Sequence, residues 1–164
     1  MRRVSPRHER GSRRQRRHSH RQEFPHLGLV QRIRWAGERH LAALLDLGLE
    51  LARFLGLGYP GGPAIDREAV HGDPEAIRFP RAMLNEGLDF SFSGLKTSVM
   101  NHVRKHPDVT AADVSASFQA AVVDVLVTKA QRAAKQVGAR GLVLGGGVAA
   151  NSLLRERFLG ACTE

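Results

Sequence analysis

Three consecutive glycines, Gly145 to Gly147, follow the apolar run 141–144, and Asn151 comes shortly after them. Glycines at the carboxyl end of a buried strand let a ligand approach the backbone, because no Cβ stands in the way. The first amides of the next helix are suited to an anionic or polar ligand, and Asn151 to a ribose or a base. The pattern matches neither G-x-G-x-x-G nor the P-loop, so nucleotide binding and a purely structural turn remain equally open.

A second glycine turn has the sequence YPGGP at residues 59–63 and is followed by Asp66. Gly61 and Gly62 expose backbone there, and the carboxylate of Asp66 could accept hydrogen bonds from ribose hydroxyls, as acidic residues do in other nucleotide sites. The residues alone favour a simpler explanation, in which Asp66 stabilises the start of its own helix through the helix dipole.

Other polar residues give weaker signals. Ser93 and Lys96 form an S-x-x-K pattern, but no S-D-N or K-T-G partner follows, so a Ser helix cap and an exposed Lys are favoured. His102 and His106 are four residues apart, yet Pro107 puts His106 at a helix end and no third ligand is near. We therefore expect solvated histidines and no metal ligands in this chain.

The elements that must position these residues can be read from periodicity and turn residues. Helices are expected at 41–55, 64–71, 94–104 (capped by Ser93), 110–136 and from 151 to about 159. Gly56, Gly72 and Gly138 are expected to stop helices, and Thr110 with Asp113 forms a capping box. Strands are expected at 88–92, which alternates, and at 141–144, a short buried run. Helix, strand, glycine turn and helix in succession predict an α/β fold.

Composition divides the 164-residue chain in two. The net charge of +9 resides entirely in residues 1–40, which hold twelve Arg and three Glu, whereas residues 41–164 hold thirteen basic and thirteen acidic residues. Residues 1–22 have almost no apolar side chain, so we expect a disordered arm that could bind RNA non-specifically. The single cysteine, Cys162, excludes a disulfide framework. No secretory signal is present, and no apolar run reaches the roughly 18–20 residues that span a bilayer, so we expect a cytoplasmic protein.

Four blocks in order resemble one family, and the resemblance covers roughly residues 51–160. They are ARFLGLGYPGGPAIDREA (52–69), FPRAMLNEGLDFSFSGLKTSV (79–99), ASFQAAVVDVLVTKA (116–130) and GLVLGGGVAANSLLRERF (141–158). The sequence resembles the tRNA N(6)-adenosine threonylcarbamoyltransferases, called TsaD in bacteria and formerly labelled O-sialoglycoprotein endopeptidases. The DFSFSGLKT block and the GGV-x-AN-x-x-LR pattern are the most distinctive parts.

The resemblance implies an actin-like, sugar-kinase-like ATPase fold with two lobes, of which this chain would hold part of the second. It implies transfer of a threonylcarbamoyl group from threonylcarbamoyl-adenylate to the exocyclic amine of the adenosine beside the anticodon of tRNA. The complete family member carries an active-site iron or zinc ion held by two His and one Asp. A paralogue, TsaB, and a small ATPase, TsaE, are its bacterial partners.

The family's substrate contacts fall on residues already noted. Its glycine in the PGGP turn falls on Gly62, its nearby acid on Asp66 and its asparagine on Asn151, with Gly145, Gly146 and Gly147 lining the adenylate. No catalytic role is assigned to Ser93 or Lys96.

Departures from the family matter equally. The H-x-x-x-H helix motif and the SGGHT loop are not found upstream of PGGP, and the acidic position of the G-E-A-x-D-K helix falls on Leu49. The chain ends at residues 162–164, too soon for the C-T-D-N motif that holds the third metal ligand. We therefore expect a partial family member at 41–164, inactive alone, behind an unrelated arm at 1–40. A frameshifted or misannotated gene start would explain the arm.

Three other functions remain as alternatives. A metallopeptidase, as in the old family label, needs a metal site that this sequence lacks. A non-enzymatic RNA-binding fragment would use the basic arm and bind tRNA with a steep salt dependence. A sugar kinase or another ATPase of the same superfamily is opposed by the FSFSGLKT block.

Overall fold

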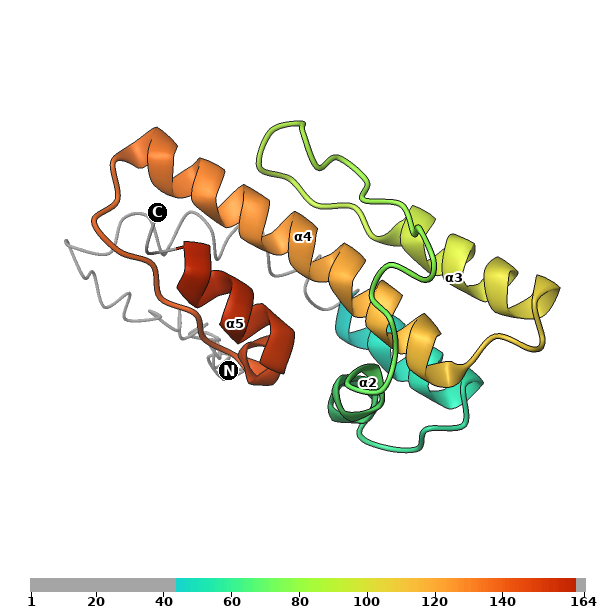
Figure 1. Cartoon of the computed structure of the whole chain (residues 1–164). Helices are drawn as coiled ribbons and strands as arrows, with labels where there is room; N and C mark the ends of the chain where they lie inside the picture. The colour runs from blue at the N-terminus through green and yellow to red at the C-terminus, as the bar shows by residue number, and fades with distance from the viewer. Residues whose placement is uncertain (1–43, 162–164) are drawn as a thin grey trace, which may run out of the picture.

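The computed structural model describes residues 44–161; the expected arm at 1–40, with His18 and His20, and the end at 162–164, with Cys162, lie outside the described residues. A helix over residues 44–54 comes first. It is followed by α2 (Gly61–Ala69), α3 (Ser93–Lys105), α4 (Ala111–Val137), the short 3-10 helix η1 (Gly147–Ala150) and α5 (Ser152–Ala161). Figure 1 shows α4 as the long central element, and both α2 and α5 pack against it.

Helix α4 is the core of the described chain. Its start is fixed as the sequence predicts. The Thr110 hydroxyl accepts a hydrogen bond from the Asp113 amide at 3.0 Å and donates one to the Asp113 carboxylate at 2.7 Å. Its end is fixed by Gly138, which has a left-handed φ of 62°. All residues from 114 to 123 are buried, so the first half of α4 is enclosed on every side. By length and composition α4 could cross a membrane, but 67% of the relevant window is buried inside this fold.

The apolar core around α4 draws on every helix before it. Its large buried members are Leu44, Leu47, Leu51, Ile65, Ile77, Phe79, Phe92, Leu95, Val99, Val114, Phe118, Val122 and Val125. The expected helix at the start of this set is confirmed over residues 44–54, with Gly56 at a φ of 71° just beyond its end.

Helix α2 begins three residues earlier than the sequence predicts, at Gly61 rather than Ala64. Pro63 is tolerated because the first-turn amides of a helix have no intrahelical partner, so a missing N–H costs nothing there. Gly61 lies against the preceding helix so closely that a Cβ on it would stand 2.6 Å from the Leu49 Cα. The glycine turn is therefore the contact point of two helices as well as the start of the second.

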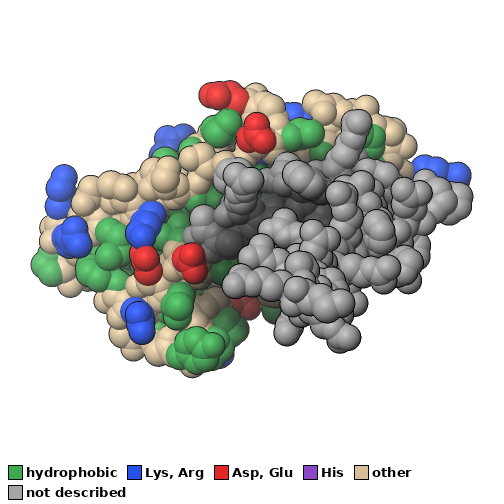
Figure 2. Space-filling model, turned by 180° about the vertical axis from the view of Figure 1, so that it is seen from behind, with side chains coloured by type: hydrophobic (Ala, Val, Ile, Leu, Met, Phe, Trp, Pro, Cys, Tyr) green, Lys and Arg blue, Asp and Glu red, His purple; other side chains and the backbone are tan. Residues whose placement is uncertain are grey.

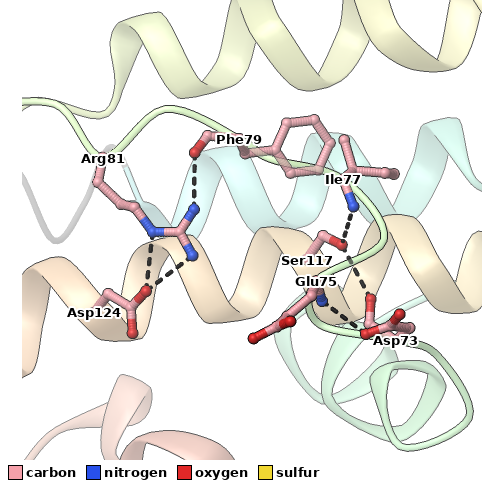
Figure 3. Close-up of polar contacts among 7 residues, drawn as sticks. All are labelled: Asp73, Glu75, Ile77, Phe79, Arg81, Ser117 and Asp124. Carbon is pink, nitrogen blue, oxygen red and sulfur yellow. Dashed lines mark hydrogen bonds and ion pairs between the residues drawn. The ribbon is translucent and has the colours of Figure 1, made fainter.

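The long connection between α2 and α3 has no regular structure and is held along α4 by hydrogen bonds. The Ser117 hydroxyl oxygen accepts from the Ile77 amide at 3.0 Å and donates to the Asp73 carbonyl at 3.1 Å. Farther along, the Arg81 guanidinium binds the Asp124 carboxylate through two nitrogens, each at 2.9 Å (Figure 3). Because these partners lie in the same order on both segments, the connection runs alongside α4 in the same direction.

Two basic side chains of α4 hold the end of this connection. Lys129 donates from Nζ to the Glu86 carbonyl at 2.6 Å and more weakly to the Gly87 carbonyl at 3.4 Å. Arg132 donates to the carbonyls of Gly87 at 2.9 Å and Leu84 at 3.1 Å. These bonds give partners to backbone carbonyls in a segment that has no regular structure.

The two expected strands are not formed in the described residues. Residues 88–92 and 141–144 do not form strands, and the side chain of Val143, expected to be buried, is 79% exposed. A strand exists only when a neighbouring strand supplies its hydrogen bonds, and no described segment does so here. The α/β expectation is therefore not confirmed: between residues 44 and 161 the regular structure is helical.

Helix α3 confirms the expected span but not its expected cap. It begins at Ser93 itself, Phe92 occupies the cap position, and no side chain caps the helix. The side chains of Phe92, Leu95 and Val99 are buried, so packing rather than capping fixes this start. The helix ends at Lys105, two residues before Pro107, as the sequence predicts.

The surface of the described chain carries both signs of charge. Figure 2 shows basic and acidic side chains interspersed on the face seen from behind, with hydrophobic side chains between them. This distribution agrees with the balanced charge of residues 41–164 in the sequence.

Candidate functional site

The fold brings Asp66 and Asn151 together, although they lie 85 residues apart in the chain. The Asn151 Nδ2 donates to the Asp66 Oδ1 at 3.1 Å. Asp66 comes from the middle of α2, and Asn151 from the residue between η1 and α5. Two residues that the sequence singled out from separate glycine turns thus form one polar cluster.

Asp66 also holds the start of α5. Its carboxylate accepts from the Ser152 amide at 3.1 and 3.2 Å and from the Ser152 hydroxyl at 2.8 Å. A carboxylate at a helix N-terminus is stabilised by unpaired amides and by the helix dipole. The sequence-based explanation placed Asp66 in the first turn of its own helix; that is wrong, because α2 has no acid in its first turn and the helix end that Asp66 serves is that of α5.

Gly62 lies one turn before Asp66 on α2, and residues four apart share a helix face. It is exposed, and a Cβ built on it would meet nothing within 4 Å. In contrast, its neighbour Gly61 is buried against the preceding helix. The two glycines therefore have different structural roles. Gly61 permits close packing of two helices, and Gly62 leaves the backbone exposed one turn from Asp66.

The glycine turn at residues 145–147 leads, through η1, to Asn151. Gly145, Gly146 and Gly147 are exposed, and a Cβ on any of them would meet nothing within 4 Å. Gly146 has a φ of 87°, a conformation that strongly favours glycine. Asn151 then caps α5, because its Oδ1 accepts from the Leu154 amide at 2.8 Å. The expected last helix is thus confirmed, with its start fixed by both Asn151 and Asp66.

Ser93 and Lys96 are not arranged as a catalytic pair. The Lys96 ammonium forms an ion pair with Glu50 on the first helix, and the Ser93 hydroxyl lies 3.4 Å from that of Ser91. Lys96 therefore joins α3 to the first helix.

The rings of His102 and His106 contact each other at a tilt, with centroids 4.5 Å apart, and His102 also meets the Phe79 ring edge-on. Burial, and secondly the charge of His106, lower the pKa of His102. They line an open pocket of about 210 Å³ with Asp108 and Asp113. Among residues 44–161 no group of three or more His, Cys, Asp or Glu side chains is arranged to hold a metal ion.

Sequence reasoning missed two polar residues of α4, Gln119 and Lys129, both buried. Lys129 carried a signal: it continues the helical spacing of Phe118, Val122 and Val125 and so falls on the apolar stripe. Burial, followed by the nearby Arg132, lowers the pKa of its ammonium. Gln119 carried no such signal, because its partners Asp66 and Asn151 are distant in sequence.

Comparison with known proteins identifies the family of this chain. Residues 26–164 match the family model described as "TsaD: tRNA N6-adenosine threonylcarbamoyltransferase", a transferase. The chain belongs to this family, which implies an actin-like ATPase fold. The match begins inside the segment 1–40 that the sequence analysis treated as unlike the family.

Two curated relatives carry the name tRNA N6-adenosine threonylcarbamoyltransferase. The chain is 50% identical over 146 residues to the one from Desulfitobacterium hafniense (strain Y51), an alignment that covers 86% of this chain and 42% of the relative. It is 55% identical over 111 residues to the one from Geobacter sp. (strain M21), covering 65% of this chain and 32% of the relative. The chain thus spans less than half the length of either relative.

Proposed function

We propose that this chain supplies an adenylate-binding part of a tRNA-modifying transferase. The complete enzyme would move the threonylcarbamoyl group from threonylcarbamoyl-adenylate to the exocyclic amine of the adenosine beside the anticodon. Family membership supports this reaction. The observation that carries the site assignment is the hydrogen bond between Asp66 and Asn151, with the open Gly62 one turn away on α2.

The reaction would be an acyl transfer. The amine nitrogen of the adenosine bonds to the carbamoyl carbon, the bond from that carbon to the phosphate oxygen breaks, AMP leaves with the bonding electrons, and the amine releases a proton. In this scheme the open backbone at Gly145 to Gly147 approaches the adenylate, as does that at Gly62. Asp66 accepts from a ribose hydroxyl, and Asn151 holds the carboxylate in place.

The iron or zinc ion of the family does not fit the described residues. His102 meets the Phe79 ring edge-on and His106 lies beside His102, no group of three His, Cys, Asp or Glu side chains among residues 44–161 is arranged to hold a metal, and none of the proposed ligand contacts is a histidine. No step of the proposal therefore runs through a metal held by residues 44–161.

The partners of the complete enzyme follow from the family alone. We expect tRNA as substrate, a TsaB-like paralogue and a TsaE-like ATPase as protein partners, and a cytoplasmic location. The chain alone is expected to make no modified adenosine in tRNA, because it spans less than half of either relative. Formation of modified adenosine by the purified chain would contradict this expectation.

The experiment that tests the site is titration of the purified chain with AMP, followed by NMR chemical shifts. Signals of residues around Gly62, Asp66 and Asn151 are expected to move, and Gly62→Ala is expected to weaken binding because its Cβ occupies open space that the ligand needs. Gly94→Ala is the matched control, since Gly94 is also an exposed helical glycine with no atom within 4 Å of a built Cβ. Shifts confined to other residues would refute the proposed site.

A further inference from the structure

Gln119 lies where three elements of the candidate site meet. It stands in the buried half of α4, and only 6% of its surface is exposed. Its Nε2 donates to the Asp66 Oδ1 at 3.0 Å and to the Asn151 Oδ1 at 3.4 Å. Asn151 in turn donates to Asp66, so the three side chains form a closed set of hydrogen bonds.

The orientation of the Gln119 amide is determined by these two partners. Both are oxygen atoms, so turning the amide over would place its own oxygen against them and lose both bonds. The opposite atom, Oε1, is buried and has no hydrogen-bond partner among the described residues. An unpaired buried acceptor destabilises a folded protein. Core packing alone would favour an apolar side chain at this position, and the polar cluster is what explains a glutamine.

The bonds from Gln119 determine which groups of the cluster stay available to a ligand. Within residues 44–161, the Asp66 Oδ1 accepts from Gln119, Asn151 and Ser152, whereas Oδ2 accepts only from the Ser152 amide at 3.2 Å. The Asn151 Oδ1 is occupied by Gln119 and the Leu154 amide, and one Nδ2 proton by Asp66. Among residues 44–161, the Asp66 Oδ2 thus retains acceptor capacity and the second Nδ2 proton of Asn151 has no hydrogen bond, so the pair offers an acceptor and a donor suited to a ribose hydroxyl.

We propose that Gln119 is a positioning residue that holds Asp66 and Asn151 in the orientation that receives the ribose of the adenylate. The ligand part of this statement rests on the proposed function, whereas the orientation of the two side chains does not. Gln119 would act through its neighbours and make no contact with the adenylate.

The first test uses the ligand-free chain and NMR of side-chain amides. The Gln119 amide protons are expected to exchange slowly with solvent, and their signals to move in Asp66→Asn. In Gln119→Met, which keeps the volume and removes the donor, the Asn151 amide signals are expected to move and exchange faster. Gln136→Met is the control, because Gln136 lies on the same helix and is exposed. Unchanged Asn151 signals, or rapidly exchanging Gln119 protons in the original chain, would overturn the proposal.

The second test measures AMP affinity. Gln119→Met is expected to weaken AMP binding roughly tenfold, because Asp66 and Asn151 lose the bonds that orient them towards the ligand. Equal AMP affinity in the original chain and Gln119→Met would refute the positioning role. If the original chain binds no AMP, the proposed function fails, and the side-chain amide signals of the first test still decide whether Gln119 orients Asp66 and Asn151. The exchange measurement on the unmodified Gln119 gives that answer even if the variant does not fold.

Discussion

Asp66 and Asn151 are hydrogen-bonded at 3.1 Å and join α2 to the start of α5. The same carboxylate receives the amide and the hydroxyl of Ser152, so one side chain serves both as the proposed ligand contact and as the anchor of a helix. This double use means that stability and ligand binding are coupled at Asp66.

Asp66→Asn is expected to lower the free energy of unfolding by about 1–3 kcal/mol, because donors from Gln119 and Ser152 lose their charged acceptor. Urea unfolding would measure this loss. Asp46→Asn is the control, since Asp46 is exposed on the first helix, and it should change the value by less than about 0.5 kcal/mol. Equal effects of the two substitutions would show that the Asp66 cluster contributes nothing to stability.

Gly61→Ala and Gly62→Ala are expected to differ sharply, although the two residues are neighbours. A Cβ on Gly61 would lie 2.6 Å from the Leu49 Cα and 2.9 Å from the Gly48 carbonyl, both backbone atoms that cannot turn aside. We expect Gly61→Ala to destabilise by about 1–3 kcal/mol through overpacking. Gly62→Ala should leave the thermal unfolding midpoint unchanged or slightly raised, since alanine favours helix. Equal midpoints for the two variants would contradict the packing at Gly61.

Lys129→Met is expected to destabilise the chain by about 1–3 kcal/mol, because the Glu86 carbonyl would lose its donor. Hydrogen exchange should also become faster in residues 84–90, which Lys129 holds against α4. Lys135→Met provides the comparison, because Lys135 is exposed on the same helix. A Lys129→Met variant with unchanged stability and exchange would show that Arg132 alone holds this segment.

The pH dependence of stability should contain a contribution from His102. Burial of its ring, and secondly the charge of His106, lower the pKa of His102. Between that lowered value and the ordinary value of about 6.5, the unfolded chain binds more protons than the folded chain. Stability is therefore complete above about pH 6.5 and falls as the pH decreases below it. His102→Gln should reduce the slope of the unfolding free energy with pH between about pH 7 and pH 5. His71→Gln, at an exposed position, should leave that slope unchanged. An unaltered slope in His102→Gln would refute this assignment.

The sequence predicted those parts of the fold that local chemistry decides. Thr110, Asp113 and Gly138 define α4 through bonds within a few residues of each other, so their roles were readable without a structure. The strands were not, because residues 141–144 can form a strand only beside another strand, and the described chain offers none. The sequence also singled out Asp66 and Asn151 as candidate site residues, which remains a prediction. Their clustering and the hydrogen bonds of Gln119 were not readable, because those contacts join residues 32 to 85 positions apart.

The connection held along α4 also bears on the order of folding. Its bonds to α4 run from Asp73 with Asp113 to Gly87 with Arg132, and each spans between 40 and 48 residues. None can form until α4 presents its turns in sequence, and each needs closure of a loop of that size. Each closure requires α4 to be formed already, so we expect the connection to be fixed after α4. Residues 73–87 are accordingly expected to gain protection from solvent later than α4 during refolding.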